Sequence, residues 1–156
     1  MDEAVAEKLK KACKMKPTGV RAIFISDDEI LKAYEHLTRT QPEEIIILFK
    51  LLVYSGIRAV HAIELINNFD RSQLIEIKEK SIARYPILEF SKGQKRGYFA
   101  YIPLEFAREE LRRINISHRD YTERARYKRV SANTIRKWHY NFMIENGFPE
   151  SVADFI

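Results

Sequence analysis

The sequence predicts a mainly α-helical domain that carries a small antiparallel β-hairpin or sheet, which is an α+β fold. Two observations support this prediction: apolar residues recur at helical spacing along most of the chain, and one central stretch holds two β-favouring runs around a turn. The composition is that of a folded protein, because 46% of the 156 residues are hydrophobic and 31% are charged. A chain of this length is expected to form one compact domain.

Two helix start signals open the predicted core. Ser26, with Glu29 three residues later, has the spacing of a capping box, and apolar residues follow it at helical period. Thr40, with Pro42 in the first turn, repeats the start signal ahead of the segment EEIIILFKLLVY. This segment is apolar nearly all round, so we expect a helix that lies buried at the centre of the domain.

The middle of the chain changes from helical to β-favouring patterns. Ser55 and Gly56 are predicted to end or kink the central helix, and a helical pattern resumes over residues 60–68. Residues 85–90 and 98–102 are rich in aromatic and β-branched side chains and are separated by SKGQKRG. We therefore predict a β-hairpin with a basic tip.

The last third of the chain is predicted to be helical and basic. Pro103 opens a helix that extends through residue 111, and the basic segment YTERARYKRV follows after a polar stretch. Ser131 is expected to cap an amphipathic helix that closes at Gly147, and Pro149 is expected to begin another.

Positive charge is clustered in two segments. The formal net charge is only +5, but residues 8–21 contain six Lys or Arg and no acid, and residues 108–129 contain eight against four acids. Such clusters suit contacts with phosphate groups, and they also fit a solvated helix face. We interpret residues 1–22 as a basic N-terminal arm or linker and residues 23–156 as the folded domain.

Several classes of protein are disfavoured by what the sequence lacks. The single cysteine, Cys13, excludes an internal disulfide and a Cys-rich zinc site, and the four histidines lie too far apart for a recognisable metal motif. We therefore expect no metal and no small-molecule cofactor. The opening residues lack the apolar core of a signal peptide, and no apolar run is long enough to cross a membrane. These features predict a cytoplasmic protein without a membrane partner.

Three segments occur in the order and spacing of a known enzyme family. LLVYSGIRAVHAIEL places Arg58 after an apolar helix and a Ser-Gly break, KGQKRGYFAYIPL is the basic hairpin, and VSANTIRKWHYNFMIENGFPESVADFI places Arg136 on a helix. Together they resemble the motifs of tyrosine recombinases, or phage-type integrases, and most closely the integrases of archaeal spindle-shaped viruses and related plasmids. The resemblance covers most of the chain and implies the fold of a tyrosine recombinase catalytic core.

The resemblance also implies a site that breaks and rejoins DNA. Arg58 and Arg136 would hold the scissile phosphate, because guanidinium stays charged and offers a planar fork of donors. Lys95 aligns best with the lysine that protonates the departing 5′ oxygen, and Lys92 is its rival. Asn133 takes a catalytic position that is usually His or Lys, although an amide can neither carry charge nor act as a general base. The candidate DNA-contact residues are Lys92, Arg96, Arg124, Arg126, Lys128 and Arg129.

Two further positions depart from the family pattern or imitate it. The residue three after Arg58 is usually acidic and orients that arginine, but here it is His61, with Glu64 one turn further on. His61 is interpreted as a structural histidine or as a substitute hydrogen-bond partner. Tyr140 imitates the attacking tyrosine, but it follows Arg136 by four residues on one helix and is interpreted as a packing residue.

The family's attacking tyrosine is expected beyond Ile156, so we interpret the chain as a catalytic core that is inactive alone. The implied partners are a double-stranded DNA attachment site and, in a full-length protein, other integrase protomers. Because the family's tetramers form through a C-terminal tail, we expect this chain to be a monomer. Two alternatives stay open: a non-catalytic DNA-binding domain or inactive integrase remnant that occupies the same sites, and a helical protein-interaction domain.

Overall fold

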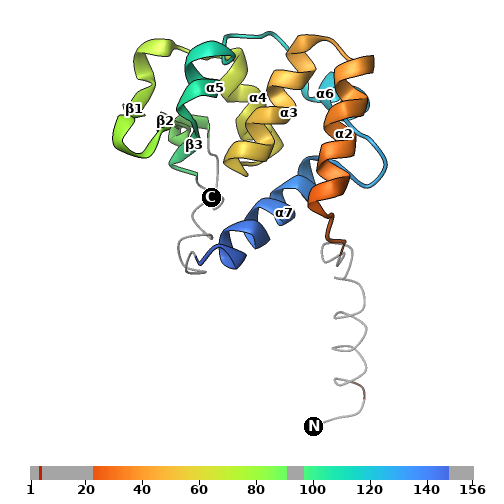
Figure 1. Cartoon of the computed structure of the whole chain (residues 1–156). Coiled ribbons are helices and arrows are strands. Elements are labelled where there is room, and N and C mark those ends of the chain that lie inside the picture. The colour runs from red at the N-terminus through yellow and green to blue at the C-terminus, as the bar shows by residue number, and fades with distance from the viewer. Residues whose placement is uncertain (1–3, 5–22, 91–96, 148–156) are drawn as a thin grey trace.

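The structure of the protein is a computed structural model that describes residue 4 and residues 23–90 and 97–147. Helices dominate these residues, and a small antiparallel sheet lies at one side of the domain (Figure 1). The predicted α+β fold is therefore confirmed. The N-terminal arm, the hairpin-tip residues Lys92, Lys95 and Arg96, and the helix predicted from Pro149 lie outside the described residues.

Helix α2 (Asp27–Thr40) begins with the predicted capping box. The backbone N–H of Glu29 donates to the Ser26 hydroxyl at 3.2 Å, and the backbone N–H of Ser26 donates to the Glu29 carboxylate at 2.7 Å. The prediction that Thr40 caps the next helix was wrong. Thr40 is the last residue of α2, where its hydroxyl donates to the His36 carbonyl at 2.9 Å, and Pro42 takes the N-cap position of the next helix.

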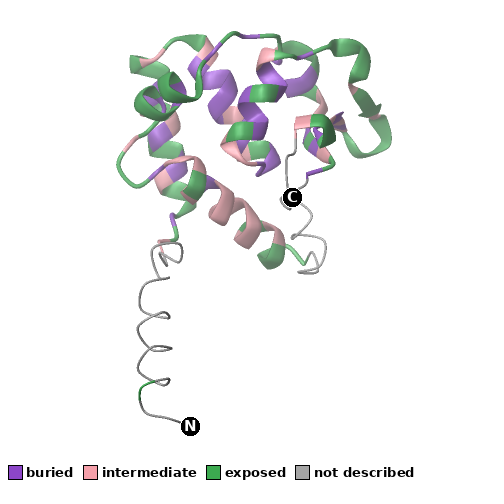
Figure 2. Cartoon of the chain, turned by 180° about the vertical axis from the view of Figure 1, so that it is seen from behind, coloured by how far each residue is buried: buried purple, intermediate pink, exposed green. Residues whose placement is uncertain are grey.

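Helix α3 (Glu43–Ser55) lies at the centre of the domain, as its apolar sequence predicts. Leu48 and Leu51 are completely buried, and Figure 2 shows the buried residues concentrated on the central helices. The helix ends at Gly56, whose φ of 68° is a left-handed conformation that favours glycine. Helix α4 (Ala59–Asn67) follows at once, with Arg58 at its N-cap.

The sheet has three antiparallel strands in the order β1-β2-β3. The predicted hairpin is present as β2 (Ile82–Pro86) and β3 (Phe99–Pro103), whose buried residues Tyr85 and Ala100 pair across the strands. Strand β1 (Ile75–Ile77) was not predicted, and it pairs along the other edge of β2. Pro103 ends β3 and caps α5 (Leu104–Glu109), so it precedes this helix instead of lying inside it.

Two more helices complete the described part of the chain. Helix α6 (His118–Arg124) was not predicted, and it forms because Ser117 caps it and Tyr121 anchors it in the core. Helix α7 (Ala132–Glu145) starts as predicted, where the backbone N–H of Ser131 donates to the Thr134 hydroxyl at 2.9 Å. Figure 1 shows α7 crossing beneath α3 and the start of α2, and α7 and α3 are in contact.

Candidate functional site

The two arginines singled out by the sequence lie close together in space. Arg58 immediately precedes α4, and Arg136 lies on the second turn of α7, where it is partly buried. Burial lowers the pKa of Arg136, and the positive charge of Arg58 lowers it further. The charges of the two guanidinium groups therefore interact where α7 contacts α3.

His61 completes this group of three side chains. It lies one turn after Arg58 on α4 and is only 6% exposed. Burial lowers the pKa of the imidazole, and the charges of Arg58 and Arg136 lower it further. The histidine is therefore neutral at pH 7 and lies within the electrostatic reach of both arginines. Glu64 is exposed and accepts a hydrogen bond from the Asn68 side chain, so it does not take the place of an acid beside Arg58.

The β-hairpin also reaches this group. Gly97, just before β3, packs so tightly that an added Cβ would lie 2.8 Å from Ile87 Cδ1 and 3.6 Å from His61 Nδ1. The backbone N–H of Ile87 donates to the Tyr98 carbonyl at 3.0 Å and closes the base of the hairpin at this point. Lys95 precedes Gly97 by two residues in the chain. The predicted lysine thus precedes, by two residues in the chain, a glycine that lies beside His61.

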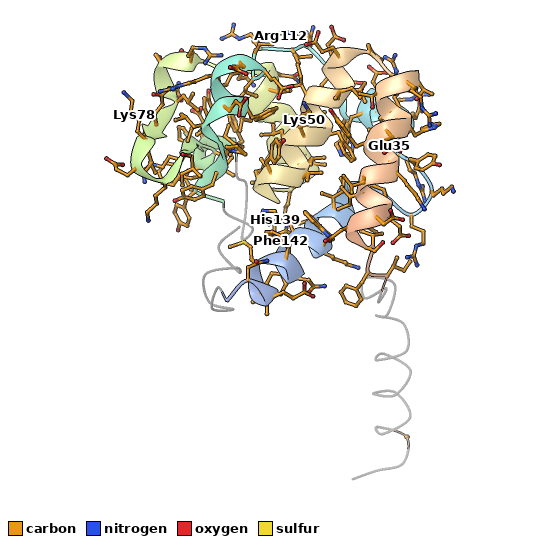
Figure 3. All side chains as sticks on the ribbon, viewed as in Figure 1. Glu35, Lys50, Lys78, Arg112, His139 and Phe142 are labelled. Carbon is orange, nitrogen blue, oxygen red and sulfur yellow. The ribbon has the colours of Figure 1, made fainter. Side chains whose placement is uncertain are left out.

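Gly56 and His139 explain how α7 comes to lie beside the start of α4. A Cβ at Gly56 would lie 2.9 Å from Cε1 of His139 and closer still to its Nδ1, so only glycine leaves room for the ring. His139 Nε2 donates to the Tyr54 carbonyl at 3.1 Å, and Figure 3 shows this side chain between α7 and the end of α3. Because His139 is one turn from Arg136 and Gly56 is two residues from Arg58, this contact fixes the spacing of the arginines.

Asn133, the remaining predicted catalytic residue, and Tyr140, which imitates the attacking tyrosine, both lie on α7. Asn133 is exposed in the first turn, three residues before Arg136 and therefore on the same helix face. Tyr140 is partly buried one turn after Arg136. A tyrosine on the same rigid helix moves together with Arg136, which agrees with its interpretation as a packing residue.

The basic residues after α6 have local partners. Arg129 forms a bidentate pair with Glu29 at 2.8 and 2.9 Å, and Arg124 donates to the Gln41 side chain at 3.2 Å. Both contacts hold the segment against α2. Arg126 and Lys128 are exposed, and Lys128 has a φ of 51°, which is unusual for a residue other than glycine. The structure does not include any of these residues in the group around Arg58.

A surface hollow of ≈ 420 Å³ lies apart from the arginines, between the start of α2 and one side of α7. Its lining includes Phe24, Trp138 and Phe142. Trp138 donates from Nε1 to the Asp27 carboxylate at 2.7 Å and packs on Phe142, so it joins the two helices. This role supports the interpretation of Trp138 as a packing residue.

Metal ligands and membrane spans were also sought. Within residues 23–90 and 97–147, no group of three or more His, Cys, Asp or Glu side chains could hold a metal ion. No helix in the described part of the chain is both long and apolar enough to cross a membrane.

Comparisons with known proteins identify a family and a similar fold. Residues 22–156 match the family model described as archaeal phage integrase. The fold is similar to a solved structure entitled "Crystal structure of XerA recombinase", with a TM-score of 0.53 and 15% sequence identity. That similarity covers 87% of this chain and 56% of the other, so this chain spans little more than half the length of that protein. No match was found among curated proteins.

Proposed function

Because this chain belongs to the archaeal phage integrase family, we propose that it is the catalytic domain of a site-specific tyrosine recombinase, which breaks and rejoins duplex DNA. One observation carries the proposal: Arg58 and Arg136, from distant parts of the sequence, are brought to one region by the packing of His139 against Gly56 and the Tyr54 carbonyl. Two guanidinium groups in one region suit the oxygens of a DNA phosphate.

The proposed chemistry assigns one step to each group. Arg58 and Arg136 bind the non-bridging oxygens of the scissile phosphate and stabilise the negative charge that grows on them during attack. A tyrosine oxygen attacks phosphorus as the phenol gives its proton to solvent, and the bond between phosphorus and the 5′ oxygen breaks. Lys95, with Lys92 as the alternative, gives a proton to the departing 5′ oxygen. Asn133 donates a hydrogen bond to a phosphate oxygen.

The covalent phosphotyrosine link retains the energy of the broken bond, so rejoining needs no nucleotide cofactor. The motif order that this chain shares with the family places the attacking tyrosine after the Arg136 helix and a further basic position. We therefore propose that the tyrosine comes from residues beyond those printed here. The partners proposed for the longer protein are its DNA attachment site and other integrase protomers.

A second candidate function is a DNA-binding domain without catalysis. The observation that favours it is Asn133, which is uncharged and exposed at a position where the resemblance implies His or Lys. This candidate predicts the same arginine-dependent DNA binding and no cleavage.

The test begins with a duplex enriched from a random DNA pool for binding to the chain. In this duplex, the 5′ oxygen at the proposed cleavage position is replaced by sulfur, which is a good leaving group. Hydrogen peroxide is added as a small external nucleophile in place of tyrosine. We expect cleavage by the wild-type chain and a large loss of cleavage for Arg58→Ala and for Arg136→Ala. Arg119→Ala is the matched control, because Arg119 is exposed on α6 and forms an ion pair with Glu123 at 3.1 Å.

The outcomes separate the two candidates. Cleavage that requires both arginines supports the recombinase. Binding of the enriched duplex without cleavage, either by this chain or by a longer protein that continues past Ile156, supports the DNA-binding domain. Failure to enrich any duplex, or equal binding by the arginine variants and the wild type at several salt concentrations, would contradict both.

A further inference from the structure

The two faces of the small sheet differ in what covers them. Side chains alternate between the faces along each strand. Glu76 stands in register with the buried residue Ala83 and pairs with Arg108 of α5 at 2.9 Å, so this helix covers the buried face. The opposite face, here called the outer sheet face, consists of Ile75, Ile77, Ile82, Arg84, Pro86, Phe99, Tyr101 and Pro103. All of these except Arg84 are apolar or aromatic, and the face is partly open because Ile75 is 43% and Tyr101 40% exposed.

Arg84 lies at the centre of the outer sheet face, between Ile75 on β1 and Tyr101 on β3. Its guanidinium carbon lies 4.5 Å from the centroid of the Phe99 ring, and the centroids of the Phe99 and Tyr101 rings are 6.3 Å apart. No carboxylate in the described part of the chain forms an ion pair with Arg84, and its Nε has no hydrogen-bond partner there. A planar cation and two aromatic rings thus lie side by side, and no acid compensates the charge.

We propose that the outer sheet face binds unpaired bases of a single DNA strand, which stack on the Tyr101 ring and on the guanidinium plane of Arg84. The inference deepens the proposed function and rests on it. A strand that is cut and then joined to a different strand must first lose its base pairs next to the cut. The freed bases then need a surface on which to stack.

The outer sheet face begins close to the candidate phosphate site. A Cβ at Gly97 would lie 3.6 Å from Nδ1 of His61, and His61 is one turn after Arg58. Phe99 follows Gly97 by two residues, which is about 7 Å of extended chain. Bases that separate beside the phosphate site therefore have a stacking surface on the same hairpin.

The charge near this face favours a DNA strand over an apolar protein segment as its occupant. Residues 75–86 contain three Lys or Arg and two acids, but Glu76 points to the opposite face and is neutralised by Arg108. Residues 91–96, which lie between β2 and β3 in the sequence, add three Lys or Arg and no acid. Proteins that bind single strands combine aromatic rings for the bases with positive charge for the phosphates.

The first test compares a thymidine oligonucleotide with an abasic strand of the same length, which carries the same charge but no bases. Binding is measured by fluorescence anisotropy at constant salt. We expect the wild type to bind the thymidine strand more tightly. Tyr101→Leu keeps an apolar side chain without the ring, and it should lose about fivefold or more of this preference, the effect of one stacked base. Tyr101→Phe should retain it.

Phe142→Leu is the matched control. The Phe142 ring is 45% exposed, similar to that of Tyr101, but it lies on α7 and not on the sheet. We expect this variant to keep the preference for the thymidine strand. Equal binding of the two strands by the wild type, or a preference that persists in a folded Tyr101→Leu variant, would overturn the inference.

A second measurement uses only the wild-type chain, in case Tyr101→Leu does not fold. A single strand that contains 5-iododeoxyuridine is bound and irradiated, and the cross-linked peptide is identified by mass spectrometry. We expect cross-links in the peptide that contains Phe99 and Tyr101. Cross-links confined to other segments would contradict the proposal. So would self-association of the chain that Tyr101→Leu abolishes, because the face would then be an interface between two copies.

These results are separable from the proposed function. If cleavage depends on Arg58 and Arg136 but the chain shows no preference for bases, the recombinase stands and the role of the outer sheet face falls. If the arginine variants bind duplex DNA as the wild type does, the phosphate site is wrong. A thymidine preference that depends on Tyr101 would still support stacking on this face.

Discussion

Replacing Gly56 by alanine tests how the two arginines are brought together. Gly56 ends α3 with a φ of 68°, and the space where its Cβ would project is filled by the His139 ring, with Cε1 only 2.9 Å away. The alanine variant therefore meets two separate penalties: a left-handed backbone conformation with a side chain, and overlap with a ring that α7 holds in place.

The size of each penalty can be worked out. A left-handed conformation costs a non-glycine residue about 1–2 kcal/mol. Forcing a methyl group into a filled space costs about 1–3 kcal/mol when the neighbours must move. We expect Gly56→Ala to lower the free energy of unfolding by about 2–5 kcal/mol in total. To relieve the overlap α7 must shift, and DNA affinity should fall too because Arg136 moves with it.

Gly147 provides a matched control in the same chain. Its φ is 86°, but no described residue lies within 4 Å of the position of an added Cβ, so among these residues Gly147→Ala meets the backbone penalty alone. The free energy of unfolding of both variants is measured by urea denaturation followed by circular dichroism. The loss for Gly56→Ala minus the loss for Gly147→Ala is the cost of the overlap with the ring. Adding His139→Ala to Gly56→Ala should cost less than the sum of the two single changes. Equal destabilisation by Gly56→Ala and Gly147→Ala would refute the reasoning, because the ring would then not occupy that space.

Three further predictions concern stability. Ser26→Ala removes a side-chain acceptor of the α2 capping box and should lower the free energy of unfolding by about 1 kcal/mol in urea denaturation. Arg71→Ala removes donors to the carbonyls of Ala107 and Leu111 at 3.0 and 2.7 Å and should lower the free energy of unfolding by about 1.5–3 kcal/mol in the same assay. An unchanged free energy of unfolding would contradict a role of Arg71 in stabilising the end of α5. The pKa of Glu29 is lowered by its hydrogen bonds to the Ser26 backbone and Arg129, so its stabilisation is complete above pH 4.5 and is lost as the pH falls through the lowered value. Melting temperatures measured against pH should therefore fall less steeply on the acid side for Glu29→Gln than for the wild type, and identical slopes would argue against this ion pair.

Local signals in the sequence predicted the starts and ends of several helices. The Ser26 capping box and the left-handed Gly56 are determined by a few neighbouring residues, so the sequence was sufficient to predict them. The same kind of signal failed at Thr40, because its hydroxyl bonds backward to α2 instead of forward to α3. A helix end and a following helix start then compete for one residue, and only the three-dimensional structure decides between them.

Elements with little apolar surface escaped the sequence patterns. Strand β1 is three residues long and none of its residues is buried, so its Ile-Glu-Ile sequence is too short for the alternation to mark a strand. Helix α6 is polar apart from Tyr121 and lies in a segment whose charge dominates its composition. Both form because they pack against neighbours, β2 for the strand and the core for the helix, and such neighbours are not visible in a local window of sequence.

The sequence likewise predicted only part of the candidate site. The order of Arg58, the hairpin and Arg136 could be read from motifs that resemble a known family. Their proximity depends on the contact between Gly56 and His139, which joins segments more than eighty residues apart in the chain. His61 is buried beside Gly97 of the hairpin, a neighbour that a local window of sequence does not show, so the sequence left its role open between packing and hydrogen bonding.

The central claim is that Arg58 and Arg136 hold one and the same DNA phosphate. It is tested most directly by replacing single phosphates of the enriched duplex, one at a time, with uncharged methylphosphonates and measuring affinity for the wild type, Arg58→Ala and Arg136→Ala. We expect one position at which the loss of affinity seen with the wild type becomes smaller in both variants, with a coupling energy on the order of 0.5–3 kcal/mol for each arginine. Coupling of the two arginines to different phosphates, or to none, would contradict it.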